Sequence, residues 1–257
     1  MLGDAMSSET LVQVTCEEVP RGNSPAWLTE HILRQSLGPT GFESDLSGRV
    51  LVVYPTDESR KQALAEMPIN QAIDSTLHHT IDSLKSSLVA DLRLPRVLST
   101  EGGFELVLHE ACRREAARLA FPMINPLPEM RWGRGKTAAL AELHSYLTRE
   151  SAEAAWDGPG IVSFGFIIRK LERRLGGTHP DLVASRIIGE LNRGEKPFSL
   201  LDVDGIIMLD HPPELPLSHI ELMLAVSRHC PIHQLAHPGN FRLGHHGMLL
   251  LDQHPIK

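Results

Sequence analysis

The sequence predicts an α/β fold in which a parallel sheet is interrupted by a long helical segment. Short β-branched runs alternate with amphipathic helical patterns near both ends of the chain, whereas the middle holds helical patterns only, separated by Pro and Gly. Parallel strands need crossover connections, so the strands before and after the middle fit one sheet. We therefore expect an α/β domain from residues 1–95 and 200–257, with a helical insertion over 96–199.

Each element follows from a local pattern. The run at 49–54 is nearly continuous in β-branched residues, which is typical of a strand covered on both faces. Pro and Gly bound most of the other segments. In chain order we expect strand 11–15, helix 24–36, strand 49–54, helix 57–67, strand 72–74, helix 77–90, helices 104–120, 137–149, 164–175 and 182–191, strand 205–209, helix 218–228, strand 232–236 and strand 248–251.

Composition limits the class of protein. With 257 residues, of which 42% are hydrophobic, the chain can bury a core, and its few aromatic residues leave the filling to Leu, Val, Ile and Ala. The net charge of −7 argues against a surface that is basic all over but leaves room for a local basic patch. Three widely spaced cysteines indicate neither a disulfide framework nor a thiolate zinc site. Without a long apolar run or a signal-like start, we expect a soluble cytoplasmic protein with no membrane contact.

A Gly-Lys-Thr sequence stands at Gly135, Lys136 and Thr137, as at the end of a phosphate-binding loop. The first glycine of that pattern is replaced by Met130, and no buried strand precedes it. We therefore expect a solvated turn that opens a helix.

Metal-dependent chemistry is one alternative. Two carboxylates can position Mg²⁺ and a phosphate, and three histidines spaced by four residues would share one face of a helix. Pro231 and the strand expected at 232–236 separate those histidines, however. The candidate ligands are Asp202, Asp204, Asp210, Glu214, His229, His233 and His237.

Three basic clusters occur in the helical middle. Such clusters are usually solvated helix faces, but if they align they can hold a nucleic-acid backbone. They are Arg113, Arg114 and Arg118; Arg131, Arg134 and Lys136; and Arg169, Lys170, Arg173 and Arg174.

Several motifs occur in a recognisable order. The first expected strand leads through a short loop into a helix that reads Leu-Thr-Glu-His-Ile, and the loop holds Arg21, Gly22, Asn23 and Ser24. The strand at 49–54 ends in Pro55 and Thr56, and Thr76 and His78 form a second motif. The run at 206–209 ends in Asp210, and the last motif contains Asn240.

Taken in this order, the motifs resemble the first motor domain of UvrD-type superfamily 1 helicases, especially the degenerate N-terminal half of AddB-like helicase-nuclease subunits. The resemblance implies a RecA-like sheet, of the P-loop NTPase kind, with a helical insertion. It also implies a vestigial nucleotide site at Arg21, Gly22, Asn23, Ser24, Asp210 and Asn240, and nucleic-acid contacts at Pro55, Thr56, Thr76 and His78.

The departures from the family pattern bear on activity. Phosphoryl transfer needs a lysine at the phosphates, an acid that holds Mg²⁺ and a group that positions water. Ser24 stands at the lysine position and His211 at the glutamate position, and the second motor domain is missing from the 257 residues. We expect no catalytic residue and no resident cofactor, while ATP·Mg²⁺ binding stays open.

The leading hypothesis is thus a non-catalytic, helicase-like scaffold or DNA-binding part of a repair or recombination complex. Its partners would be single-stranded or duplex DNA and a nuclease or helicase subunit. Two alternatives remain: a metal-dependent phosphoesterase or nuclease that uses Asp210 with nearby acids or histidines, and a protein-interaction module with a closed nucleotide cleft and a docking edge at 212–216.

Overall fold

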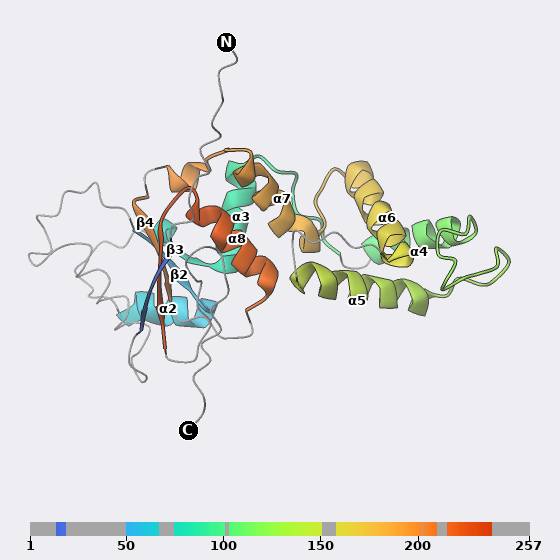
Figure 1. Ribbon diagram of the computed structural model, residues 1–257, viewed down its shortest axis with the longest axis horizontal. Helices are drawn as coiled ribbons and strands as arrows, with labels where there is room; N and C mark the ends of the chain where they lie inside the picture. The colour runs from blue at the N-terminus through green and yellow to red at the C-terminus, as the bar shows by residue number, and fades with distance from the viewer. Residues whose placement is uncertain are drawn as a thin grey trace, which may run out of the picture. The chain divides into compact units, whose positions relative to one another are not determined.

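A computed structural model describes residues 14–18, 50–66, 75–100, 103–150, 158–201, 203–209 and 215–237 (Figure 1). The chain divides into two compact units. The sheet unit comprises Met1–Leu92, Glu190–Leu215 and Leu222–Lys257. The helical unit comprises Arg93–Gly189 and Pro216–Glu221. No helix in the described ranges is long and apolar enough to cross a membrane.

The described part of the sheet unit contains five parallel strands, which confirms the α/β class and the parallel sheet. Their order across the sheet is β1-β5-β4-β2-β3. Val52 lies opposite Ile207 of β4 and His78 of β3, and Ile206 lies opposite Ile232 of β5. The strands are β1 (Val14–Glu18), β2 (Val50–Tyr54), β3 (His78–Thr80), β4 (Gly205–Leu209) and β5 (Ile232–Ala236).

Strand β2 is covered on both faces, as its β-branched run predicts. Its residues from Leu51 to Tyr54 are at most 2% exposed, and successive side chains of a strand point to opposite faces. On one face, Val52 and Tyr54 form a buried cluster with Leu209, Leu235 and Ala63. Ala63 belongs to α2 (Asp57–Glu66), so this helix packs on that face.

The sheet unit's third strand corrects one expectation. A helix was expected from residue 77, but β3 occupies His78–Thr80 and α3 begins at Ile81 and ends at Asp91. Thr80 caps α3, because its Oγ1 accepts from the backbone N of Ser83 at 3.2 Å while Ser83 Oγ accepts from Thr80 N at 2.8 Å. The strands expected at 72–74 and 248–251 and the helix expected at 24–36 lie outside the described residues.

The described part of the helical unit contains helices and one isolated bridge, between Val97 and Thr178. Its core consists of Leu98, Phe104, Leu108, Cys112, Ala116, Phe121, Trp132, Leu140, Phe164, Ile167, Ile168 and Leu171. The helices are α4 (Gly103–Ala116), α5 (Arg134–Glu150), α6 (Pro159–Leu175) and the 3-10 turn η2 (Pro180–Leu182), followed by α7 (Val183–Asn192), which runs into the sheet unit.

Helix ends differ from the predicted ones for local reasons. Helix α4 stops at Ala116 instead of 120, where Leu119 has φ 60° and the N–H of Ala120 returns to the carbonyl of Glu115. Helix α6 begins earlier than expected, with Pro159 in its first turn. It ends at Leu175, as predicted, because Gly176 takes the left-handed conformation with φ 65°. The remaining described elements are the 3-10 turns η1 (Ser75–Leu77) and η3 (Phe198–Leu200) and helix α8 (Leu217–Ser227).

Candidate functional site

The carboxyl edge of the sheet is the first candidate region. All five strands are parallel, so their carboxyl ends lie at one edge. Strands β2 and β4 are neighbours in the sheet. The chain passes from β2 to β3 on one side of this pair and from β4 to β5 on the opposite side. Ligands of open α/β sheets bind where adjacent connections diverge in this way, here beyond the ends of β2 and β4. Pro55 and Thr56 follow β2 at this point, and Asp210 follows β4 in the sequence.

The predicted nucleotide-site residues lie outside the described residues. They are Arg21, Gly22, Asn23, Ser24, Asp210 and Asn240. Their prediction therefore stays a prediction.

Thr56 has a structural role at this edge. Its Oγ1 accepts from the backbone N of Ser59 at 3.1 Å, and Ser59 Oγ accepts from Thr56 N at 3.2 Å, which caps α2. The Thr80 and Ser83 pair repeats this arrangement at the end of the adjacent strand β3. Sequence analysis did not single out Thr80, although the shared Thr-x-x-Ser spacing marks both junctions.

Thr76 and His78 are not at the edge where Thr56 lies. Thr76 precedes β3, whereas Thr56 follows β2, and the two strands run in the same direction. His78 is buried, and its Nδ1 is hydrogen-bonded to the hydroxyl of buried Tyr54 at 2.9 Å. The structure thus does not bring the four predicted nucleic-acid residues together, and it uses His78 to join β3 to β2.

The candidate metal ligands do not converge either. His229 precedes β5, His233 lies within it and His237 follows it. A five-residue strand is about 16 Å long, whereas ligands of one ion lie within a few Å of one another. Nε2 of His229 donates instead to the carbonyl of Leu191 at 3.0 Å. In the described ranges, no three His, Cys, Asp or Glu side chains are grouped so as to hold a metal ion.

The acidic candidates are separated in a similar way. Asp204 precedes β4 and is exposed, and Asp210 follows the strand in the sequence, so the two flank opposite ends of β4. Asp202 and Glu214 lie outside the described residues, as does most of the proline-rich run at 212–216.

The Gly-Lys-Thr sequence opens α5, as expected. Nζ of Lys136 donates to Oδ1 of Asn125 at 2.8 Å and to the carbonyl of Ile124 at 3.3 Å. Thr137 is buried and accepts from the indole N–H of Trp132 at 2.9 Å. Both polar side chains therefore fasten the loop before α5 to the start of the helix.

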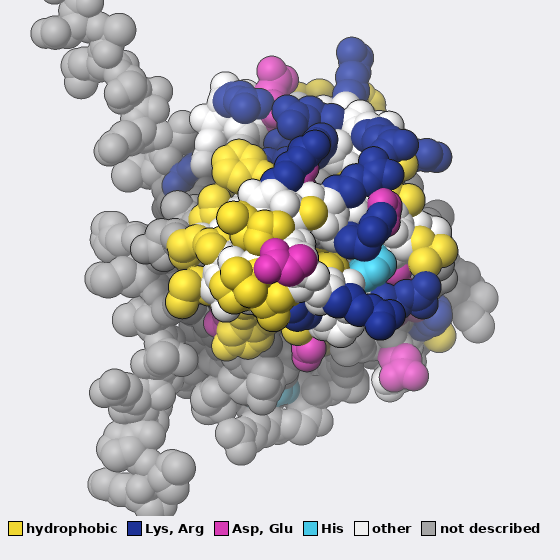
Figure 2. All heavy atoms as spheres, turned by 90° about the vertical axis from the view of Figure 1, so that its right-hand side faces the viewer, with side chains coloured by type: hydrophobic (Ala, Val, Ile, Leu, Met, Phe, Trp, Pro, Cys, Tyr) yellow, Lys and Arg dark blue, Asp and Glu magenta, His cyan; other side chains and the backbone are white. Residues whose placement is uncertain are grey.

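Charge is distributed unevenly along the chain. Residues 93–189 carry 14 of the 25 Lys and Arg residues and 11 of the 32 Asp and Glu residues. They are thus net positive in a chain that is net negative. Figure 2 shows Lys and Arg gathered over one part of the face that α4, α5 and α6 present, next to an area of hydrophobic side chains.

Two of the three basic clusters come together on α4 and α6, which pack against each other. All seven of their side chains are exposed. They are Arg113 and Arg114 on α4, Arg118 in the turn that follows α4, and Arg169, Lys170, Arg173 and Arg174 on α6.

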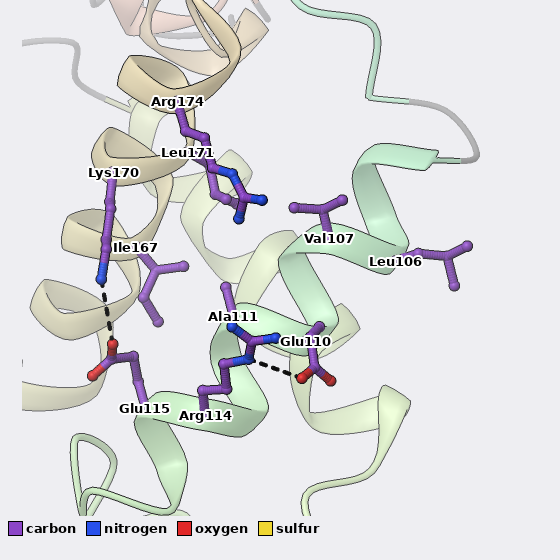
Figure 3. A pocket seen from close by; sticks show the side chains of 10 residues that line it. All are labelled: Leu106, Val107, Glu110, Ala111, Arg114, Glu115, Ile167, Lys170, Leu171 and Arg174. Atoms are coloured by element: carbon purple, nitrogen blue, oxygen red, sulfur yellow. Dashed lines mark hydrogen bonds and ion pairs between the residues drawn. The ribbon is translucent and has the colours of Figure 1, made fainter.

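A groove of about 360 Å³ lies between these two helices. Hereafter we call it the α4/α6 groove. Figure 3 shows Ile167 and Leu171 directed from α6 toward α4, which faces them with Val107 and Ala111. The complete lining is Leu106, Val107, Glu110, Ala111, Arg114, Glu115, Ile167, Lys170, Leu171 and Arg174. The groove thus combines an apolar floor with a charged rim.

Two glutamates hold part of the rim in place. Glu110 accepts from Arg113 at 2.8 Å and from Arg114 at 2.9 Å, and Glu115 lies 3.7 Å from Nζ of Lys170 across the groove. Hydrogen bonds from Arg113 and Arg114 lower the pKa of Glu110 to about 2. Glu110 therefore stays ionised near neutral pH, and the seven cations of the two clusters still outnumber the rim's two glutamates.

A buried acid anchors the end of α6. Glu172 is 5% exposed and accepts from the backbone N of His179 at 2.7 Å and from Arg186 at 3.0 Å. Its carboxylate thus ties the end of α6 to α7, which fixes the helix that carries four of the seven cations.

The described thiols do not offer a nucleophile. Burial raises the pKa of Cys112 to about 12 and that of Cys230 to about 11. Thiols with such values stay protonated at neutral pH and are inert. Both cysteines are buried and free.

The fold and the groove together define a parallel α/β protein with a separate, basic helical unit. No protein-family model matches the chain, and no curated protein is significantly similar to it.

Proposed function

We propose that this chain is a non-catalytic, helicase-like protein that binds nucleic acid through the cationic surface of α4 and α6, as part of a DNA repair or recombination complex. The observation that carries this proposal is the joining of two sequence-distant basic clusters on one pair of packed helices. Exposed Arg and Lys side chains around a groove are what a phosphate backbone requires.

The architecture supports the helicase-like part of the proposal. The parallel sheet, with its divergence point between β2 and β4, is compatible with a RecA-like domain. The position of the helical unit, largely between β3 and β4 in the sequence, supports the expected helical insertion. The substitutions at Ser24 and His211 support the absence of ATP hydrolysis, because they remove two of the groups that phosphoryl transfer needs.

The test is a titration of fluorescent single-stranded DNA at two salt concentrations, with and without ATP·Mg²⁺. We expect binding that weakens steeply with salt and is unaffected by ATP, since released counterions drive association with a phosphate backbone. The double variant Arg114→Glu/Arg174→Glu should weaken binding. It should also lower the salt slope by about 1.4, at roughly 0.7 per phosphate contact on a single strand.

The matched control is Arg131→Glu/Arg149→Glu, which likewise reverses two exposed charges, both outside the groove. This variant should bind as the parent does. If the control weakened DNA binding as much as the groove variant does, the affinity would depend on the net charge of the protein and not on the groove. Absence of DNA binding at both salt concentrations would refute the proposal and favour the protein-interaction alternative.

A further inference from the structure

We infer that the α4/α6 groove selects single-stranded over duplex nucleic acid, with Phe166 as a platform on which an unpaired base stacks. This inference rests on the proposed function and makes it specific, because it names the form of nucleic acid that is bound. Three features carry it: an exposed aromatic ring among cations, an apolar groove floor, and the spacing of cations along α6.

Phe166 is the first feature. Its side chain is 63% exposed, although burial would be favourable for so large an apolar group. The guanidinium carbon of Arg169 lies 4.8 Å from the centroid of its ring. Residues three and four apart share a helix face, so Phe166 has Arg169 and Lys170 as neighbours on α6. An exposed ring flanked by cations is the combination that proteins use to stack bases and bind the adjoining phosphates.

The floor of the groove is the second feature. Val107, Ile167 and Leu171 line it and offer nothing to a phosphate; Ile167 and Leu171 are 5% and 4% exposed, so Val107 gives most of the floor's accessible surface. In a duplex the bases are stacked inside and the phosphates face outward, so an apolar floor would stay uncovered. A single strand can turn its bases to the floor and to Phe166 while its phosphates meet the rim.

The rim is the third feature. Lys170 and Arg174 are one helical turn apart on α6, or about 6 Å along the axis, and Arg114 stands on α4 across the groove. That spacing is of the same order as the distance between successive phosphates of an extended strand. The strand would therefore follow α6 and reach Phe166, which lies outside the groove lining, one turn before Lys170, which belongs to it.

The observations favour a nucleic acid over an acidic protein segment. A protein helix in the groove would use the apolar floor and the rim, but it would leave Phe166 and its Arg169 partner without a role. Base stacking uses all three features at once.

The experiment compares the full chain with Phe166→Ala, Phe166→Tyr and Phe198→Ala. Phe198 is the matched control, since it is 76% exposed and belongs to the sheet unit. The probes are an oligothymidylate and a duplex of equal length, at one salt concentration. We expect Phe166→Ala to weaken binding of the oligothymidylate about tenfold or more and to leave duplex binding unchanged. Phe166→Tyr, which keeps the ring, and Phe198→Ala should bind as the parent does.

A second readout is independent of affinity. In Phe166→Trp the new indole should be quenched when oligothymidylate is added and not when duplex is added. Far-ultraviolet circular dichroism of every variant checks that the helices are intact.

The outcomes separate the two proposals. If Phe166→Ala binds single strands as the parent does while Arg114→Glu/Arg174→Glu does not, the stacking role is refuted and the nucleic-acid function stands. Equal binding of duplex and single strand by the parent would likewise refute the selectivity. If the parent binds neither probe, and an acidic amphipathic peptide binds instead, the proposed function itself falls.

Discussion

Replacing Lys136 by alanine distinguishes a phosphate-binding lysine from a structural one. In the structure its ammonium group donates to Oδ1 of Asn125 at 2.8 Å and lies 5.6 Å from the centroid of the Trp132 ring. Asn125 is fully buried, so its amide oxygen would lose a charged donor without gaining access to water. The variant should therefore unfold more easily, whatever happens to nucleotide binding.

The expected magnitude follows from these contacts. A hydrogen bond from a charged donor contributes about 1.5–3 kcal/mol, and the half-buried position of Lys136 reduces this toward the lower end. The contact with the indole ring adds about 0.5 kcal/mol. We expect Lys136→Ala to lower the free energy of unfolding by about 2 kcal/mol.

Urea denaturation followed by circular dichroism measures this change, and a nucleotide titration of the same samples tests the other role. The control is Arg134→Ala, an exposed neighbour in the same segment, for which we expect a change within about 0.5 kcal/mol. The reasoning is refuted if Lys136→Ala is as stable as the parent, or if the parent binds ATP and the variant loses that binding with its stability unchanged.

Three further predictions concern the helical unit. Glu110→Gln should tighten binding of single-stranded DNA about threefold, because it removes an anion beside the groove and releases two arginines; a DNA titration that shows no gain at low salt would contradict this. Gly177→Ala should lower the free energy of unfolding in urea by about 1–3 kcal/mol, since an added Cβ would collide with the Leu98 side chain and lie 2.8 Å from the carbonyl oxygen of Arg96; parent-like unfolding would show that the backbone relaxes freely. Burial lowers the pKa of His179 below its ordinary value of 6.5, so its contribution to the free energy of unfolding should be complete above pH 6.5 and be lost as the pH falls below that value. In urea denaturation at several pH values, the unfolding free energy of His179→Gln should depend less on pH than that of the parent. An equal pH dependence in the two proteins would rule out His179 as the cause.

Two of the strands match their prediction to the residue, whereas β1, predicted at 11–15, is Val14–Glu18. Strands β4 and β5 have the predicted bounds, because their apolar runs are set off by Gly205 and Pro231. Strand β3 was misplaced, since a run of two histidines and a threonine carries no apolar alternation. Its strand conformation depends on pairing with β2 and on the bond between His78 and Tyr54, which lie far apart in the sequence.

The candidate site was predictable only in part. The sequence located the basic clusters, but each cluster alone is indistinguishable from a solvated helix face. Which clusters meet is decided by the packing of α4 on α6 through Leu108, Ile167 and other core residues. The third cluster shows why sequence alone does not identify a binding surface. Its Lys136 donates a hydrogen bond to Asn125 and has a structural role.

The helicase resemblance and the charge distribution favour different surfaces for nucleic acid. The resemblance indicates the sheet edge at Thr56, whereas the charge distribution favours α4 and α6. The hydroxyl of Thr56 caps α2, yet an oxygen with two lone pairs and one proton can cap a helix and still contact a ligand. Such a contact contributes only about 0.5–1.5 kcal/mol, whereas non-specific affinity for nucleic acid comes almost entirely from the neutralisation of phosphates. Outside residues 93–189 the chain holds 21 of its 32 acidic residues and 11 of its 25 basic ones, so that part repels a phosphate backbone. The charge distribution therefore favours the exposed cations of α4 and α6 over the sheet edge at Thr56 as the surface that holds a phosphate backbone.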